Sequence, residues 1–419
     1  MEIQVKEDMD MQKKWWHDKV AYQIYPKSFC DTNGDGIGDL RGIISKLDYL
    51  KELGVDIIWL SPIYKSPFVD QGYDISDYYA IAEEFGTMEE FDELLAEAKK
   101  RDMYLIMDLV VNHCSDKHEW FQKALADPDG PYADYFYFRK GKNGNPPSNY
   151  RSYFGGNCWE PVPGSDKYYF HMFAKEQPDL NWENPKVRRA IYDMILWWMD
   201  KGVGGFRLDV IDQIAKEPDK RITINGPRLQ EYFKELSRET FQKGDLITVG
   251  EAWGADTERA KLYSNPDGSE FSMVFQFEHI GLDQKDGGEK WDLAPLPFKK
   301  LKKIMAHWQN ELYNCGWNSL FWDNHDLPRI VSRWGNDREY RVESAKMLAI
   351  LLHGMQGTPY IYQGEELGMT NVQYDIEDYK DCEIINMYHE RLEKGYSKDE
   401  IMKSIYAKGR DNARTPMQW

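Results

Sequence analysis

The middle of the chain reads Gly205-Phe206-Arg207-Leu208-Asp209-Val210-Ile211, a short apolar run that carries one arginine and one aspartate. Side chains two positions apart in a β-strand point to the same side, so a strand here places Arg207 beside Asp209. A guanidinium next to a carboxylate lowers the pKa of the carboxylate, and we therefore expect Asp209 to be ionised and able to attack an electrophile. A structural ion pair at a strand end is the alternative, and this stretch alone does not choose between the two.

Similar short apolar runs recur along the chain and alternate with longer amphipathic stretches. The expected strands are residues 20–25, 55–60, 104–109, 205–209, 246–250, 271–277, 319–322 and 359–362. The expected helices are residues 43–53, 88–101, 185–200, 229–241, 298–313 and 343–353. Such alternation implies a parallel sheet, and eight repeats fit an α/β fold of the closed (β/α)8 (TIM) barrel type. An open doubly wound sheet is the alternative, but the chain has no Gly-rich dinucleotide fingerprint to support it.

Two polar segments interrupt this alternation. Residues 113–177 show no clear helix and are rich in Gly, Pro, Asn, Tyr and Trp. Because a structureless loop of this length is unusual, we expect a small inserted domain, domain B, after the third strand. A second insert, at about residues 370–408, follows the eighth strand. The barrel, domain A, then comprises residues 15–112 and 178–419.

Composition narrows the function classes and the compartment. The net charge of −18 over 419 residues argues against a nucleic-acid partner and against an anionic membrane surface. No apolar run reaches the roughly 18 residues of a membrane span. The five cysteines are scattered without a CxxC pair, which suggests neither a zinc site nor a disulfide framework. The first fifteen residues are charged and predict no secretory signal, so we expect a cytoplasmic protein.

Polar residues gather where the expected strands end, which in such a barrel is where catalytic groups lie. The third strand leads into His113, the fourth into Asp209, the fifth into Glu251, and the seventh into His325 and Asp326. Repulsion among unpaired carboxylates would lower stability without a functional gain. This set fits glycoside cleavage, with Asp209 attacking the anomeric carbon and Glu251 first protonating the leaving oxygen and then activating water. Asp326 is expected to stabilise the positively charged sugar ring.

These blocks resemble glycoside hydrolase family 13, the α-amylase family, from about residue 15 to residue 419. The matching segments are 54–62 (GVDIIWLSP), 108–113 (DLVVNH), 177–182 (QPDLNW), 205–209 (GFRLD), 251–253 (EAW), 324–326 (NHD) and 357–366 (GTPYIYQGEE). The resemblance implies that Asp209 is the nucleophile, Glu251 the general acid/base and Asp326 the transition-state stabiliser of a retaining mechanism.

Within the family, the chain looks most like oligo-1,6-glucosidases and dextran glucosidases, through 71–74 (QGYD) and 409–419 (GRDNARTPMQW). The likeness implies that Asp74 and Arg410 grip the glucose at the non-reducing end, which closes the pocket and makes the action exo. It also implies that the same subsite is lined by Tyr73, His113, Arg207 and His325.

The residue after the nucleophile bears on the linkage. Val210 resembles the residue of α-1,6-acting members, whereas α-1,4 specialists usually carry a smaller one. We therefore expect an α-glucosidase that releases glucose from short α-glucans and prefers α-1,6 linkages, as in isomaltose and isomalto-oligosaccharides. A trehalose-6-phosphate hydrolase and an α-1,4-preferring α-glucosidase are the alternatives. The substrate partner is a small oligosaccharide, and the oligomeric state is left open.

A loop after the first strand has the character of a calcium site. Counting from Asp31, oxygen ligands occupy positions 1, 3, 5 and 9 with Gly at position 6, as in an EF-hand loop. Gly42 stands where that loop has its bidentate Glu, and a solvated Asp/Gly turn is the alternative. Related α-glucosidases hold a structural Ca²⁺ here, and by resemblance the ligands are Asp31, Asn33, Asp35, Asp39 and the carbonyl of Ile37.

Members of the family continue past this point with an eighth helix and a C-terminal β-sandwich, domain C. The 419 residues of this chain end before both. We therefore expect the barrel to leave apolar surface uncovered near its last strand.

Overall fold

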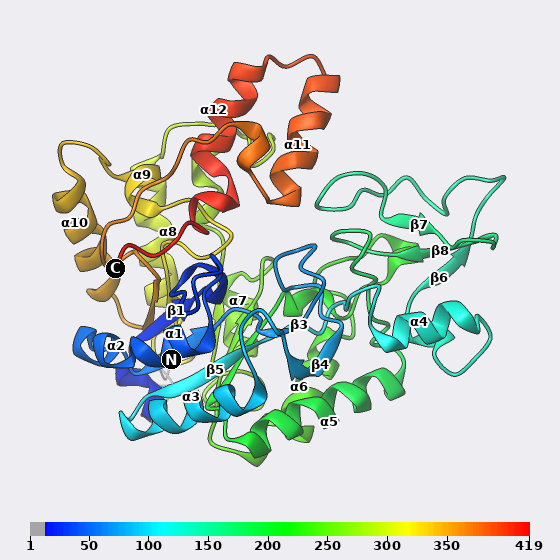
Figure 1. Cartoon of the computed structure of the whole chain (residues 1–419), viewed down its shortest axis with the longest axis horizontal. Coiled ribbons are helices and arrows are strands. Elements are labelled where there is room, and N and C mark those ends of the chain that lie inside the picture. Colours follow the sequence, from blue (N-terminus) through cyan, green and yellow to red (C-terminus); the bar gives the residue numbers. More distant parts are fainter. Residues whose placement is uncertain (1–12) are drawn as a thin grey trace, which may run out of the picture.

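The computed structural model describes residues 13–419, and its centre is a parallel sheet of eight strands (Figure 1). Most of the charged stretch that predicts no secretory signal lies outside these residues. In order around the sheet, the strands are β1 (Ala21–Ile24), β2 (Ile57–Leu60), β5 (Tyr104–Leu109), β9 (Gly205–Leu208), β10 (Ile247–Glu251), β11 (Met273–Phe275), β12 (Ser319–Leu320) and β13 (Thr358–Tyr362). β13 pairs with β1, and Val274 of β11 bridges in parallel to Asn318, directly before β12. The sheet therefore closes, and the prediction of a (β/α)8 barrel is confirmed.

Alternation along the strands divides the core into two layers. Ile57 and Trp59 of β2 belong to an apolar cluster built almost wholly from strand residues and their neighbours, which fills the barrel. Ile58 and Leu60 belong to a larger cluster that also contains helix residues such as Leu50. A strand with both faces buried in this way reads as a continuous apolar run, which is why these strands could be located from the sequence.

Helices surround the barrel between successive strands. They are α1 (Leu40–Ser45), α2 (Leu47–Leu53), α3 (Met88–Lys100), α5 (Pro185–Lys201), α6 (Leu229–Glu239), α7 (Thr257–Tyr263), α8 (Phe298–Glu311), α9 (Ile330–Trp334) and α10 (Arg341–His353). The 3₁₀ helices are η1 (Trp15–Asp18), η2 (Pro26–Ser28), η3 (Ala133–Tyr135), η4 (Ile211–Gln213), η5 (Pro218–Lys220), η6 (Phe241–Lys243), η7 (Ile280–Asp283), η8 (Ile376–Asp378) and η9 (Arg410–Asn412). The helix expected at residues 43–53 is two helices, because Lys46 leaves helical geometry at ψ 3°. Helix α7 was not predicted, since its seven residues are too few to show a helical period.

The segment 113–177 holds a small antiparallel sheet with its own apolar cluster. Its strands are β6 (Phe138–Lys140), β7 (Trp159–Pro161) and β8 (Lys167–Phe170), in the order β6-β8-β7. The expectation that this segment contains no helix is wrong. Helix α4 (Glu119–Ala126) begins after His118, whose side chain accepts a hydrogen bond from the amide of Trp120 and so caps the helix.

Two further features frame the barrel mouth. A hairpin of β3 (Tyr64–Lys65) and β4 (Asp77–Ile81) holds the loop between them. The segment 370–408 forms α11 (Cys382–Glu393) and α12 (Lys398–Lys408), which stand at the top of Figure 1. The segment 113–177 reaches this helix pair through Arg151, whose Nη2 lies 2.7 Å from Glu390 Oε2.

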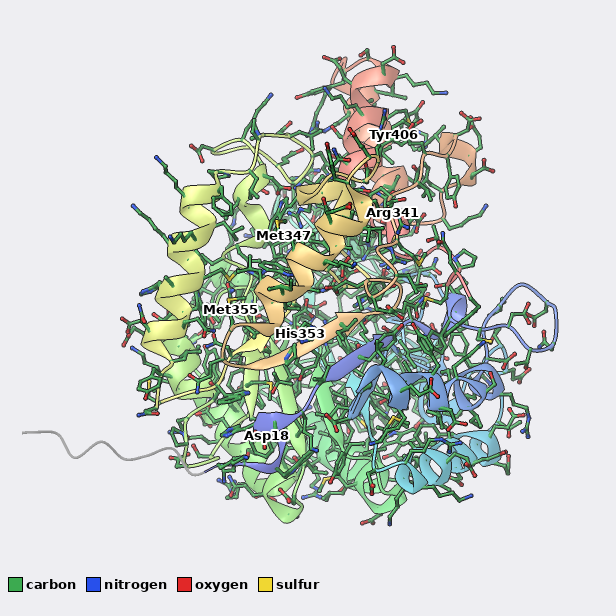
Figure 2. All side chains as sticks on the ribbon, turned by 90° about the vertical axis from the view of Figure 1, so that its left-hand side faces the viewer. Asp18, Arg341, Met347, His353, Met355 and Tyr406 are labelled. Carbon is green, nitrogen blue, oxygen red and sulfur yellow. The ribbon has the colours of Figure 1, made fainter. Side chains whose placement is uncertain are left out.

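Helix α10 exposes several apolar side chains. Met347 is 53% exposed and Ile350 is 73% exposed, and Val342 and Leu351 are exposed beside them. Figure 2 faces this side of the molecule and labels Met347 on the helix. Among the helices of residues 13–419, none has the length and apolar character needed to cross a bilayer.

Candidate active site

A cavity of about 370 Å³ lies at the carboxyl ends of the barrel strands. This volume is within the range of small-molecule sites, roughly 300–1,000 Å³. Its walls include the predicted residues Tyr73, His113, Asp209, Val210, Glu251, Asp326 and Arg410. The three carboxylates that the sequence analysis singled out, Asp209, Glu251 and Asp326, therefore share one cavity.

Arg207 lies at the base of this cavity and contacts three carboxylates at once. Its Nη1 is 2.7 Å from Asp108 Oδ1 and 2.8 Å from Asp209 Oδ1, and its Nη2 donates a hydrogen bond to Glu251 Oε2. The guanidinium is 1% exposed. The pairing of β5 with β9 sets Asp108 opposite Arg207, so the sheet register brings the charges together. The prediction that Arg207 lies beside Asp209 is confirmed, and one rigid group fixes the relative positions of Asp209 and Glu251.

The pKa of Asp209 does not follow the direction expected from Arg207 alone. Burial raises this pKa, Arg207 lowers it, and the negative charges of Glu251 and Asp108 raise it again. The pKa of Asp209 therefore lies well above that of an ordinary carboxyl group. Burial also raises the pKa of Asp108, to about 6, against the opposing effect of Arg207. The sequence showed the arginine but not how little water and how many carboxylates surround the nucleophile.

Both oxygens of Glu251 are held by donors from neighbouring residues. The backbone amide of Val210 lies 3.1 Å from Oε2, and Trp253 Nε1 lies 2.9 Å from Oε1. The indole of Trp253 is itself stacked on Phe277, with ring centroids 3.9 Å apart. Val210 adopts φ 34° and ψ 44°, a left-handed conformation that is strained for a β-branched residue. Such strain is typical of functional sites, and here it turns the amide toward the carboxylate.

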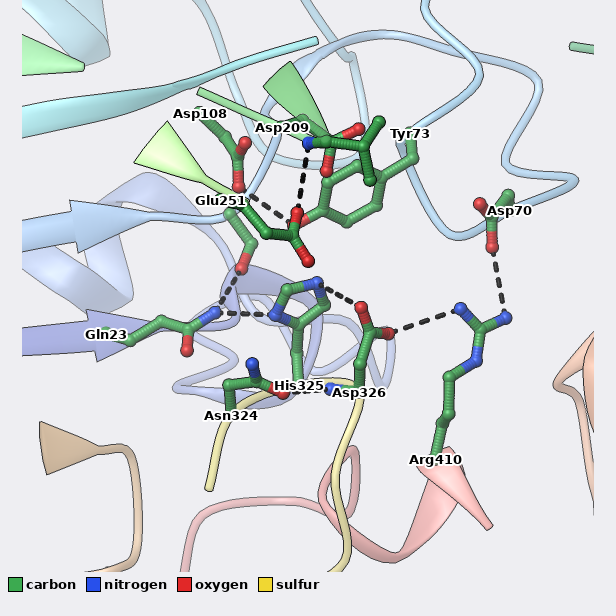
Figure 3. Close-up of polar contacts among 12 residues, drawn as sticks. Gln23, Asp70, Tyr73, Asp108, Asp209, Glu251, Asn324, His325, Asp326 and Arg410 are labelled. Atoms are coloured by element: carbon green, nitrogen blue, oxygen red, sulfur yellow. Dashed lines mark hydrogen bonds and ion pairs between the residues drawn. The ribbon is translucent and has the colours of Figure 1, made fainter. Parts of the chain in front are cut away.

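Asp326 faces this pair from the seventh strand and is surrounded by positive groups (Figure 3). Arg410 Nη1 lies 3.2 Å and Arg414 Nη2 lies 2.7 Å from its Oδ1. Burial opposes ionisation, but His325, Arg410 and Arg414 more than offset it and hold the pKa of Asp326 well below its usual range. Asp326 is therefore ionised at neutral pH.

His325 lies directly behind the cavity wall. Its Nε2 is 3.3 Å from Asp326 Oδ2 and its Nδ1 is 2.8 Å from Gln23 Nε2. Burial lowers its pKa to about 3, so the ring is neutral. Since the Gln23 amide donates to Nδ1, the proton of the neutral ring is on Nε2, which faces Asp326. Of the predicted substrate-binding residues, His325 and Arg207 support the wall from behind rather than line it.

One end of the cavity is closed by ion pairs around Arg410. Its Nη2 lies 3.2 Å from Asp70 Oδ1 and also donates to Asp381, which is fully buried. The prediction that Asp74 shares this role needs correction. Asp74 is fully buried and its oxygens accept hydrogen bonds from the amides of Val69 and Asp70, at 2.9 and 3.0 Å. Asp74 shapes the loop between β3 and β4, and Asp70 is the carboxylate that reaches the cavity.

Tyr73 and His113 form the adjoining wall. The hydroxyl of Tyr73 donates to Asp108 Oδ2 at 2.8 Å, and its ring stacks on His325 with centroids 5.1 Å apart. Burial lowers the pKa of His113 to about 4, so this ring is also neutral. The polar edge and flat faces of these rings suit a sugar, which has hydroxyl groups around an apolar ring face.

Residues from the two inserted segments complete the cavity, and the sequence analysis did not single them out. Tyr153, Phe154 and Phe173 come from segment 113–177, while Glu383 and Lys408 come from segment 370–408. The only feature of the sequence that pointed to them was the high aromatic content of segment 113–177. Contacts between segments so far apart in the chain could be located only in the folded structure.

The loop at residues 31–39 arranges its oxygens around its own backbone. Asp31 accepts from the amides of Asn33, Gly34 and Gly36, at distances of 2.7 to 3.0 Å, and these bonds lower its pKa. Asp39 accepts from Thr32 and caps helix α1. Within residues 13–419, no group of three or more His, Cys, Asp or Glu side chains is placed to share a metal ion.

Comparison with known proteins identifies the family of the chain. The family described as "Alpha amylase, catalytic domain" matches residues 23–419. A glucan 1,6-alpha-glucosidase of Streptococcus pneumoniae is 59% identical, and an oligo-1,6-glucosidase of Parageobacillus thermoglucosidasius is 56% identical. Each alignment covers 98% of this chain and 76% of the relative. The crystal structure of Bacillus licheniformis trehalose-6-phosphate hydrolase superposes with a TM-score of 0.91 at 52% identity, over 97% of this chain and 75% of that one. The chain therefore belongs to the α-amylase family, glycoside hydrolase family 13.

Proposed function

We propose that this chain is a retaining, exo-acting α-glucosidase that releases glucose from the non-reducing end of short α-glucans and prefers α-1,6 linkages. The observation that carries the proposal is the position of Arg207, which holds Asp209 and Glu251 together at the base of a cavity closed at one end. The named relatives, glucan 1,6- and oligo-1,6-glucosidases, support the linkage.

The carboxylates take distinct steps in this mechanism. A carboxylate oxygen of Asp209 attacks the anomeric carbon while Glu251 gives its proton to the departing glycosidic oxygen, and a covalent glucosyl–Asp209 ester forms. Glu251 then removes a proton from water, whose oxygen attacks the same carbon and frees Asp209. Two inversions at one carbon retain the configuration. Asp326, whose pKa is held low, stabilises the positive charge that the sugar ring develops in each step.

The closed end of the cavity supports exo action. Arg410 is fixed by Asp70, Asp381 and Asp326, so its guanidinium forms a wall rather than a passage. A chain can therefore insert only its terminal glucose. Charged groups in fixed positions can recognise the hydroxyls of that glucose without reorganisation.

A trehalose-6-phosphate hydrolase remains the second candidate, since a solved enzyme of that name is 52% identical. It would need a cation free to bind phosphate. Lys290 lies 2.7 Å from Glu383, and both Arg333 and Lys408 pair with Asp283. In the described part of the chain, each lysine and arginine that lines the cavity lies in an ion pair, and Arg333 and Lys408 share one carboxylate, so trehalose 6-phosphate has to be tested as a substrate.

The stereochemistry of the product tests the retaining mechanism. Proton NMR of isomaltose hydrolysis is expected to show α-glucose first, with the β-anomer appearing only by mutarotation. Asp209→Asn and Glu251→Gln should each lower kcat by about 10³-fold or more. With an activated aryl α-glucoside, azide should give α-glucosyl azide where Glu251 is replaced and β-glucosyl azide where Asp209 is replaced. Initial release of β-glucose would contradict the proposal.

We infer that the loop at residues 31–39 binds Ca²⁺ in a structural role. The donor set supports this, because Asp31, Asn33, Asp35, Asp39 and the Ile37 carbonyl offer the oxygen ligands that Ca²⁺ prefers. The loop lies away from the residues that line the cavity, so the ion would stabilise the chain after β1 and take no part in the reaction.

We also propose a cytoplasmic location. All five cysteines of the chain are free thiols, and two of them, Cys114 and Cys158, are buried. Free thiols are the usual state of cysteine in a reducing compartment.

A further inference from the structure

The neighbours of the His113 ring favour different tautomers. Its Nδ1 is 3.1 Å from Asn112 Nδ2, while its Nε2 is 3.2 Å from the carbonyl of Tyr73 and 3.1 Å from Gln177 Nε2. A neutral imidazole has one N–H and one acceptor nitrogen. The Tyr73 carbonyl requires the proton on Nε2, and an amide NH₂ at Nδ1 requires the same. The NH₂ of Gln177 requires the opposite.

Lys216 settles the orientation of the Asn112 amide. Its Nζ lies 2.5 Å from Asn112 Oδ1 and 2.8 Å from Asp179 Oδ2, and neither Lys216 nor Asp179 has an exposed side chain. Burial lowers the pKa of Lys216 and the carboxylate of Asp179 opposes this shift, while the geometry places Nζ as the donor between two oxygens. An ammonium group only donates hydrogen bonds. The oxygen of Asn112 must therefore face Lys216, and its NH₂ must face His113.

Gln177 has a second hydrogen-bond acceptor and does not need the nitrogen of His113. Its Nε2 lies 3.1 Å from Asp70 Oδ2, and its Oε1 accepts from the amide of Ala174 at 3.0 Å. One of its amide hydrogens therefore has a carboxylate partner whatever His113 does. Asn112 and the Tyr73 carbonyl therefore both favour the tautomer protonated at Nε2. Gln177 has a hydrogen-bond partner in either tautomer.

We propose that Lys216 is a positioning residue that, by orienting Asn112, holds His113 in the tautomer protonated at Nε2. His113 then has an N–H rather than a lone pair at Nε2, which the Tyr73 carbonyl accepts and which a sugar oxygen in the cavity can share. The ring is neutral at physiological pH, so without this constraint both tautomers would be populated. The sugar as ligand rests on the proposed function, whereas the tautomer itself does not.

The tautomer can be read directly by ¹⁵N NMR of the chain labelled at histidine, with His113→Gln identifying the His113 signals. In the wild type, Nε2 is expected to be protonated and Nδ1 unprotonated from pH 5 to pH 8. Asn112→Asp keeps an acceptor for Lys216 but turns a second oxygen toward His113, so Nδ1 should become protonated. Asn184→Asp is the matched control, because Asn184 is equally an amide of low exposure but caps helix α5, and it should leave the His113 signals unchanged.

A second variant tests the same inference in case Asn112→Asp does not fold. Lys216→Met combined with Asp179→Asn removes both buried charges together, frees the Asn112 amide to turn, and should produce signals of both tautomers. Asn112→Asp should also lower kcat/KM for isomaltose by about tenfold, the effect of one lost hydrogen bond to substrate.

The NMR pattern decides the inference independently of activity. A protonated Nδ1 in the wild type would overturn it, as would an Asn112→Asp variant in which Nδ1 stays unprotonated. If the chain released no glucose from any substrate, the proposed function would fail while the tautomer result would stand.

Discussion

At the scale of single residues, the carboxylates around Arg207 titrate as a group, and this shapes the pH dependence. Asp209 must be ionised to attack, and its pKa is raised by burial and by the charges of Glu251 and Asp108. We therefore predict that kcat/KM falls on the acid side at a pH above the ordinary carboxyl value of about 4. Asp108→Asn removes one negative charge, which lowers the pKa of Asp209 and should move this limb about one unit toward lower pH. If the acid limb of the pH profile of Asp108→Asn stayed in place or moved to higher pH, the prediction would be contradicted.

Asp70 and Asp74 have separate roles, which a pair of variants can distinguish. Asp70→Ala removes a partner of Arg410 in the cavity, so kcat/KM should fall roughly 10²-fold with little change in Tm. Asp74→Ala leaves the amides of Val69 and Asp70 without their acceptor, at about 1–3 kcal/mol for each buried group. Its Tm should fall by several degrees. An Asp70 variant with full activity would mean that the closed end does not bind the sugar.

Many of the residues that line the cavity could be predicted from the sequence because they lie at strand ends or soon after them. Asp209 and Glu251 lie where β9 and β10 end, Asp326 lies in the loop after β12, and strand ends are readable from apolar runs. Asp70 was missed because it lies in an irregular loop, where nothing in a linear motif shows which of two nearby carboxylates points inward. The raised pKa of Asp209 was missed because burial depends on the whole fold.

At the scale of elements, the loop at residues 31–39 gives a prediction about metal binding. If it holds Ca²⁺, a chelator should lower Tm by a few degrees, and added Ca²⁺ should restore it. Asp35→Asn should lower Tm in Ca²⁺ and abolish the response to the chelator, while kcat for surviving enzyme stays unchanged. Thermal melts that coincide with and without chelator would show that the loop is a solvated turn.

The elements themselves were predictable to different degrees. Strand β5 was located at its observed ends, since Tyr104–Leu109 is apolar apart from Asp108 and lies in a run bounded by Asp102 and Asn112. Helix α4 was missed because its eight residues lie in a segment dominated by loop-forming residues. The break between α1 and α2 was missed because Lys46 has no special propensity, and its backbone angle is set by packing on the barrel.

At the scale of the whole molecule, the apolar face of α10 sets how the protein behaves in solution. Contiguous exposed apolar patches promote association. Met347→Glu combined with Ile350→Lys should reduce light scattering at high protein concentration and leave kcat/KM unchanged, because the helix lies far from the lining of the cavity. Lys346→Glu, at an exposed polar position on the same helix, is the control. Equal scattering by all three proteins would show that this face does not self-associate.

The most direct test of the account is the rate of glucose release from isomaltose and from maltose at equal concentration, with trehalose 6-phosphate as a third substrate. The account predicts that isomaltose is cleaved fastest and that Val210→Ala lowers the ratio of isomaltose to maltose cleavage, because this strained residue borders both Glu251 and the cavity. Faster cleavage of maltose would leave the family assignment in place and contradict the linkage. Cleavage of trehalose 6-phosphate alone would replace the proposed function with the second candidate.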